Sequence, residues 1–267
     1  VGTTRGAIYH INSFNCPAIT PSKIKIYYMK PDLEHYLAAS DCIDSDDPRI
    51  IKQAQALVEG LDTDIERAIA LYYFVRDSFY YNPYTASVDV ETLRATHVLA
   101  TGEGWCVSKA VLLAALCRAS GLPARLGFAD VVNHLSTEKL RQTMSTDVFY
   151  FHGYCSIYLN DQWVKATPAF NLSLCEKFKL LPLEFNGLED SLYHRFDQHG
   201  NRHMEYIRER GEYLDVPIDD MRAVFAEHYP HIPSDTDSQG STAQSDDKDL
   251  AAQWQCEVDQ ETNPSTS

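Results

Sequence analysis

The chain has 267 residues, of which 44% are hydrophobic and 23% are charged. This composition is typical of one large or two small globular domains, and it excludes collagen-like, coiled-coil and wholly disordered chains. The longest uncharged apolar run, residues 110–117, is far shorter than the roughly 20 residues that cross a bilayer, and no leader-like segment opens the chain. We therefore expect a cytoplasmic protein that does not insert into a membrane.

The net charge of −15 argues against nucleic acid and anionic membranes as partners, because no cluster of Lys and Arg is available to displace counterions from phosphates. Residues 234–267 carry eight carboxylates against Lys248 alone, a net charge of −7. This tail is of low complexity and without hydrophobic periodicity, so we expect it to be disordered. Almost half of the excess charge therefore indicates solubility and says little about a substrate.

The first half of the chain predicts helices. Asp47 and Pro48 are typical of the start of a helix that ends at Gly60, and Thr63 with Glu66 forms the capping box of a second helix that stops before Pro83. Residues 107–119 are the strongest helical run, apolar around most of the circumference and closed by a Ser-Gly pair. A helix so apolar is expected at the centre of the fold.

The pattern changes to strands after residue 123. Residues 125–132, 148–159 and 162–167 are rich in β-branched and aromatic side chains, and residues 160–161 separate the last two runs as a hairpin turn would. Shorter pieces follow: a helix near residues 172–178 and strands near 193–196 and 204–208. Helices followed by strands predict an α+β fold, with an N-terminal extension over 1–47, one domain over 48–233 and the acidic tail over 234–267.

Cys106 stands apart from the other six cysteines, which have the irregular spacing and apolar neighbours of buried, reduced thiols. It follows Gly102, Gly104 and Trp105 and falls in the first turn of the central helix. Free backbone N–H groups and the positive end of the helix dipole favour a thiolate there, and the glycines leave the sulfur open to a substrate. We therefore predict that Cys106 is a nucleophile.

A nucleophilic thiol needs a general base, and His152 is the best placed of ten histidines. Pairing back from the turn at residues 160–161 sets Thr167 opposite Tyr154 and diagonal to His152. The three side chains then share the face of the sheet that points away from the core. This arrangement predicts a base with a neighbour that could orient its ring, although a purely structural strand histidine remains the alternative.

These residues resemble a known family. The block Gly-Trp-Cys-Val-x-Lys-Ala at 104–110, the Gly-Leu-Pro-Ala-Arg segment at 121–125, the His152 strand and the Trp163 hairpin that ends at Pro168 are similar to the transglutaminase-like superfamily of papain-like cysteine enzymes. The resemblance implies a papain-like α+β core in which a central helix carrying the cysteine packs against an antiparallel sheet carrying the histidine. It also implies attack of Cys106 on an amide or peptide carbonyl with His152 as base, a thioester, and then water or an amine as acceptor.

One residue departs from the family pattern. Thr167 stands where the family has an aspartate, just before Pro168. A hydroxyl can accept a hydrogen bond from an imidazole N–H, but it carries no charge to stabilise imidazolium. Asn171 is the first alternative for this role, by analogy with Cys-His-Asn sites, and Asp161 is a poorer one because it lies at the turn.

Three residues are candidates for binding a substrate. Trp105 is expected to form a wall of the cleft, Tyr84 follows a tyrosine-rich helix end that could line a groove, and His134 follows the first strand. The backbone N–H of Cys106 is the natural first donor of an oxyanion hole.

Cofactors and metals are not expected. The chain has no Cys-x-x-Cys pair, and His152 and Cys155 fall on opposite faces of a strand. The acidic residues at 41–47 lack the glycine and the terminal glutamate of a calcium loop.

Two functions follow, and they differ in class. The first is a cofactor-free cysteine enzyme that acts on a peptide, protein or small amide, as a peptidase, amidase or acyl transferase. The second is a catalytically weak or inactive module of the same fold that binds proteins, which the missing aspartate motivates. The substrate, the acceptor and the oligomeric state stay open.

Overall fold

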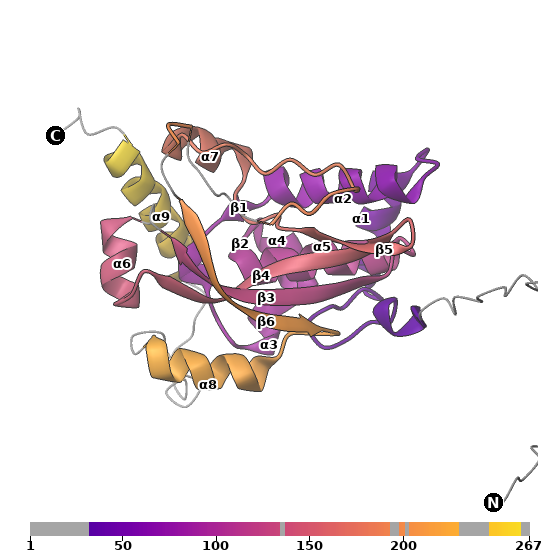
Figure 1. The fold of residues 1–267 in the computed structure, drawn as a ribbon, viewed down its shortest axis with the longest axis horizontal. Coiled ribbons are helices and arrows are strands. Elements are labelled where there is room, and N and C mark those ends of the chain that lie inside the picture. Colours follow the sequence, from indigo (N-terminus) through magenta and orange to yellow (C-terminus); the bar gives the residue numbers. More distant parts are fainter. Residues whose placement is uncertain (1–31, 134–136, 193–197, 201–202, 230–245, 263–267) are drawn as a thin grey trace, which may run out of the picture. The chain divides into compact units, whose positions relative to one another are not determined.

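Helix α5 (Cys106–Ala119) is the centre of the fold, and every residue of it from Cys106 to Arg118 is buried. It packs against strands β3 (Ala124–Asn133) and β4 (Val148–Leu159), and helices α1, α2 and α4 contact it as well (Figure 1). The computed structural model describes residues 32–133, 137–192, 198–200, 203–229 and 246–262, and those from Leu33 onward belong to one compact unit.

The main sheet is antiparallel and has the strand order β5-β4-β3-β6, with β5 spanning Gln162–Ala166 and β6 spanning Met204–Tyr213. The central helix against an antiparallel sheet confirms the predicted α+β class. The remaining elements are η1 (Glu34–Tyr36), α1 (Pro48–Val58), α2 (Asp64–Ser78), β1 (Tyr80–Tyr81), η2 (Pro83–Thr85), α3 (Val90–Leu93), α4 (Ala95–Thr101), β2 (Glu103–Gly104), α6 (Glu138–Met144), α7 (Leu172–Phe178), α8 (Ile218–His228) and α9 (Asp246–Thr262).

Local signals set the element ends that the sequence predicts. The Asp47 side chain accepts a hydrogen bond from the Arg49 N–H and caps α1. Thr63 and Glu66 form a reciprocal capping box on α2, with N···O distances of 3.2 and 3.0 Å. Because each of these bonds joins residues two or three positions apart, no tertiary information is needed to place them.

The β4–β5 hairpin turns at residues 160–161, which both have positive φ angles, 48° and 62°. Pairing runs from Leu159 opposite Gln162 to Cys155 opposite Ala166, and there it ends. The predicted pairing of Thr167 with Tyr154 is therefore wrong. The Thr167 N–H donates instead to the Ser191 carbonyl, because a later segment bridges to the end of β5.

Strand β4 contains a bulge just before His152. Ala129 pairs with His152 whereas Val131 pairs with Phe149, so β4 has one additional residue in this interval. Phe151 has a φ of 57°, a left-handed conformation that is rare for a bulky aromatic residue. The buried Asp130 carboxylate accepts hydrogen bonds from the Phe151 N–H and from Arg210 Nε. These bonds hold a strained backbone next to the candidate base.

The acidic tail is not wholly without structure. Residues 246–262 form α9, so the predicted disorder is wrong for this segment. Trp254 and Val258, four residues apart, are both buried, and the Trp254 ring lies 6.3 and 6.1 Å from the rings of Tyr81 and Tyr84. Two apolar residues on one face are too few to predict a helix in an acidic, Ser- and Gln-rich segment. The reason for their spacing is visible only when the aromatic surface that they cover is known. The predicted strand at 193–196 lies outside the described residues.

Candidate active site

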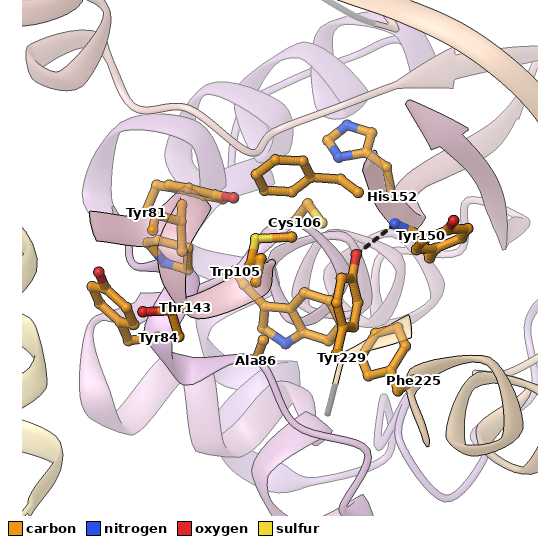
Figure 2. Close-up of a pocket in the computed structure, with 14 residues that line it drawn as sticks. Tyr81, Tyr84, Ala86, Trp105, Cys106, Thr143, Tyr150, His152, Phe225 and Tyr229 are labelled. Atoms are coloured by element: carbon orange, nitrogen blue, oxygen red, sulfur yellow. Dashed lines mark hydrogen bonds between the residues drawn. The ribbon is translucent and has the colours of Figure 1, made fainter. Parts of the chain in front are cut away.

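A cavity of about 260 Å³ lies at the N-terminal end of α5 (Figure 2). Its walls come from segments far apart in the sequence: the η2 region, the start of α5, α6, β4 and the end of α8. The lining residues are Tyr81, Pro83, Tyr84, Ala86, Trp105, Cys106, Leu140, Thr143, Met144, Phe149, Tyr150, His152, Phe225 and Tyr229. The predicted nucleophile and base thus line one cavity.

Cys106 is the first residue of α5, as predicted, but its electrostatics are not those expected. Burial raises the pKa of the Cys106 thiol to about 11, and the backbone N–H groups of Gly153, Val107 and Cys106 lower it by less. The donors at the helix start thus lower the pKa as expected, but they do not bring it below the ordinary value of a thiol. Desolvation by the surrounding aromatic wall outweighs the donors at the helix end.

His152 lies on β4, directly before the residue that touches α5. A Cβ on Gly153 would lie 2.9 Å from the Val107 Cα, so this position faces the helix and only glycine fits. The His152 side chain is buried and lines the same cavity as Cys106. The close approach at Gly153 is also what brings a β4 backbone N–H to the Cys106 sulfur.

The two candidates for orienting the histidine do not line the cavity. Thr167 is buried, its carbonyl accepts a hydrogen bond from the Tyr72 hydroxyl, and its own hydroxyl has no partner among the described residues. Asn171 is engaged at both ends of its amide: Oδ1 accepts from the Tyr81 N–H at 3.0 Å, and Nδ2 donates to Ser173 Oγ at 2.7 Å. The Asn171 amide therefore secures the backbone of β1.

Two of the three predicted substrate-binding residues are in the wall. The Trp105 ring is buried and lies 6.1 Å from the Phe225 ring, as expected for a wall residue. Tyr84 lines the cavity and donates its hydroxyl to Glu257 of α9 at 2.7 Å. His134 lies outside the described residues.

The part of the wall that α6 and α8 supply is not predicted from the sequence. Tyr229, just after α8, accepts a hydrogen bond from the Tyr150 N–H at 2.7 Å and donates to the Val148 carbonyl at 3.0 Å. Both bonds hold the β4 backbone beside the bulge. Burial raises the pKa of Tyr81 and Tyr229, and a thiolate at Cys106 would raise both further, so the two hydroxyls lie within electrostatic reach of the sulfur. No sequence spacing signals this convergence.

None of the described helices is long and apolar enough to span a bilayer. No group of three His, Cys, Asp or Glu side chains in the described part of the chain could hold a metal ion.

A family model matches the part of the chain that contains the candidate site. Residues 51–168 match the family model of the transglutaminase-like superfamily, which confirms the resemblance over this segment. It contains Cys106, His152 and Thr167. No curated protein matches the chain.

Two solved structures are similar to it. A "putative cysteine protease" from Cytophaga hutchinsonii is 18% identical with a TM-score of 0.42, over 71% of this chain and 57% of its own. A "putative protease" from Parabacteroides distasonis is 15% identical with a TM-score of 0.33, over 50% of this chain and 25% of its own. The chain thus spans little more than half, and a quarter, of these two relatives.

Proposed function

We propose that the protein catalyses acyl chemistry on an amide or peptide bond through a thioester on Cys106, with His152 as general base. One observation carries the proposal. Within a transglutaminase-like segment, a cysteine at the start of the central helix opens onto a cavity that the strand histidine also lines. The substrate would be a peptide, a protein or a small amide, and no cofactor is required.

The reaction follows from these groups. His152 takes the thiol proton, and the sulfur attacks the carbonyl carbon to form a tetrahedral oxyanion, with the Cys106 N–H as first donor to its oxygen. The C–N bond then breaks, and the leaving amine takes the proton from His152. Water or a second amine attacks the thioester carbonyl carbon and loses a proton to His152. The C–S bond then breaks, His152 returns that proton to the sulfur, and the acyl product leaves the regenerated thiol. A thiol that is neutral in the free protein is compatible with this sequence, because the proton can transfer when the substrate is bound.

The test is a search for the thioester. The protein is incubated with a panel of peptide amides and esters, with and without a primary amine, and the intact mass is followed over time. The proposal expects an acyl adduct that maps to Cys106 and product formation that stops in Cys106→Ala. His152→Gln should slow acylation by about a hundredfold or more, in line with the worth of a general base.

Cys256→Ala is the matched control, because Cys256 is an exposed thiol outside the cavity. It should leave every activity unchanged. If no acyl adduct forms with any substrate, or if Cys106→Ala keeps the wild-type rate, the catalytic proposal fails.

A non-catalytic, protein-binding module is the second candidate. Two observations favour it: burial raises the pKa of Cys106 to about 11, and neither Thr167 nor Asn171 lines the cavity. This candidate expects unchanged partner binding in Cys106→Ala, which pull-down with the wild-type protein and the variant measures.

A further inference from the structure

The wall around Cys106 is almost entirely made of aromatic and aliphatic groups. Its rings are fixed by contacts with one another: Trp105 with Phe225 at 6.1 Å, Phe225 with Tyr229 at 4.9 Å, and Tyr150 with Tyr229 at 5.7 Å. Such edge and tilted contacts stabilise a rigid surface. The cavity is therefore formed before a substrate arrives.

The polar ends of two wall residues point to protein partners. The Tyr84 hydroxyl donates to Glu257, and the Tyr229 hydroxyl binds the backbone at Tyr150 and Val148. What these tyrosines present to the cavity is mainly ring surface. Figure 2 shows Cys106 among these rings.

None of the described residues that line the cavity is Asp, Glu, Lys or Arg, although the chain as a whole carries a net charge of −15. Apart from His152, the described lining offers an ion no charged side chain to replace its hydration, which is unfavourable. At the edge, the Glu257 carboxylate that holds Tyr84 adds repulsion for an anion.

The size sets a second limit. A cavity on the order of 150 Å³ admits benzene, so the 260 Å³ at Cys106 has room for one ring or one branched aliphatic group with its carbonyl. A folded polypeptide does not fit, and only one side chain of a peptide could enter.

We propose that this cavity selects an uncharged, apolar acyl group, aromatic or branched aliphatic, on the carbonyl that Cys106 attacks. The proposal rests on the acyl chemistry proposed above and names its substrate class. The fixed rings, the lack of Asp, Glu, Lys and Arg among the described lining residues, and the volume all support the same class.

The test uses alkylation, which requires binding next to the thiol but no turnover. Three reagents with the same reactive carbon are compared: iodoacetamide, anionic iodoacetate and aromatic N-benzyl iodoacetamide. Rates at Cys106 are measured by peptide mass spectrometry and divided by the rate at the exposed Cys256 of the same molecules. Relative to iodoacetamide, we expect the benzyl reagent to react about tenfold faster at Cys106, a fraction of what full burial of a ring would give, and iodoacetate about tenfold slower.

A charge placed in the wall should remove the preference. Met144, at the end of α6, lines the cavity, whereas Gln142 on the same helix is exposed. Met144→Glu should reduce the benzyl preference to within about twofold of unity, and the control Gln142→Glu should keep it. If Met144→Glu does not fold, the three-reagent comparison on the wild-type protein decides alone.

Equal normalised rates for the three reagents would overturn the inference. This outcome is distinct from failure of the proposed function. If the protein prefers the benzyl reagent but forms no acyl adduct, the apolar selectivity stands and the proposed catalysis fails. If an acyl adduct forms but the three reagents react equally, the catalysis stands and the apolar selectivity fails.

Discussion

Cys106 and Lys109 lie one turn apart on α5 and are both buried, yet their surroundings differ completely. Lys109 Nζ donates to the carbonyls of Arg76, Phe79 and Ala169 at 3.0, 2.6 and 2.8 Å. Burial lowers the pKa of Lys109, while three carbonyls match the three protons of an ammonium group. Cys106 has backbone donors on one side and a cavity on the other. Burial alone therefore does not distinguish a structural group from a reactive one; the presence of space beside it does.

The largest expected effect on stability is at Lys109, which has no cavity beside it among the described residues. Lys109→Met leaves three buried carbonyls without a donor and should lower the free energy of unfolding by at least about 3 kcal/mol, measured by urea denaturation. Lys177→Met is the control, since Lys177 pairs with Asp259 at the surface and should cost less than about 1 kcal/mol. A loss under 1 kcal/mol in Lys109→Met would contradict the structural role.

The next largest effect is expected at Tyr229, whose hydroxyl binds the β4 backbone beside the cavity. Tyr229→Phe removes one acceptor and one donor from the β4 backbone and should destabilise the fold by about 2 kcal/mol in the same assay. Hydrogen exchange at the Tyr150 amide should accelerate in parallel. Tyr80→Phe, at an exposed position, is the control and should be neutral. Unchanged exchange at Tyr150 would mean that the hydroxyl does not hold the bulge.

The environment of Cys106, which opens onto the cavity, is tested by the pH dependence of its alkylation. Because the pKa of Cys106 is about 11, its alkylation by iodoacetamide should rise about tenfold per pH unit from pH 7 to 10, with no plateau near neutral pH. A folded pKa above the ordinary value also means that the thiol proton stabilises the fold, and that this contribution declines as pH rises from 9 to 11. A neutral plateau that His152→Gln abolishes would instead reveal a thiolate–imidazolium pair in the free protein. Cys256 gives the reference profile.

The smallest effect concerns α9. Glu257 accepts from Tyr84 and pairs with Lys139 at 2.9 Å, so Glu257→Gln should lower stability by about 0.5 to 1 kcal/mol in a thermal unfolding assay. The exposed Glu189→Gln is a charge-matched control and should have no effect. No difference between the two variants would mean that α9 is not anchored through this carboxylate.

What could be read from the sequence was local. The Asp47 cap, the Thr63 capping box and the turn at 160–161 depend on residues a few positions apart, and the structure places all three as predicted. Cys106 at the helix start belongs with them, because glycines and an apolar run mark that position directly. The His152 strand was found through alternation and hairpin register.

What could not be read depends on distant segments. The Thr167 pairing failed because Ser191 binds the end of β5. Burial raises the pKa of Cys106, and this could not be read locally because part of the wall around the thiol comes from α6, β4 and α8. The bulge at Phe151 needs Asp130 on the neighbouring strand. None of these partners lies within a window over which periodicity or capping operates.

The sequence by itself determined the α+β class, the transglutaminase-like segment and the position of Cys106 at the start of a buried helix, since hydrophobic period, caps and glycines act within one element. Only the tertiary structure decided that α9 covers Tyr84, that Asn171 secures β1, and that an aromatic cavity opens at the thiol, with no Asp, Glu, Lys or Arg among the described residues that line it. Solvation decides the chemistry of that site, and solvation is set by whichever distant side chains exclude water from it.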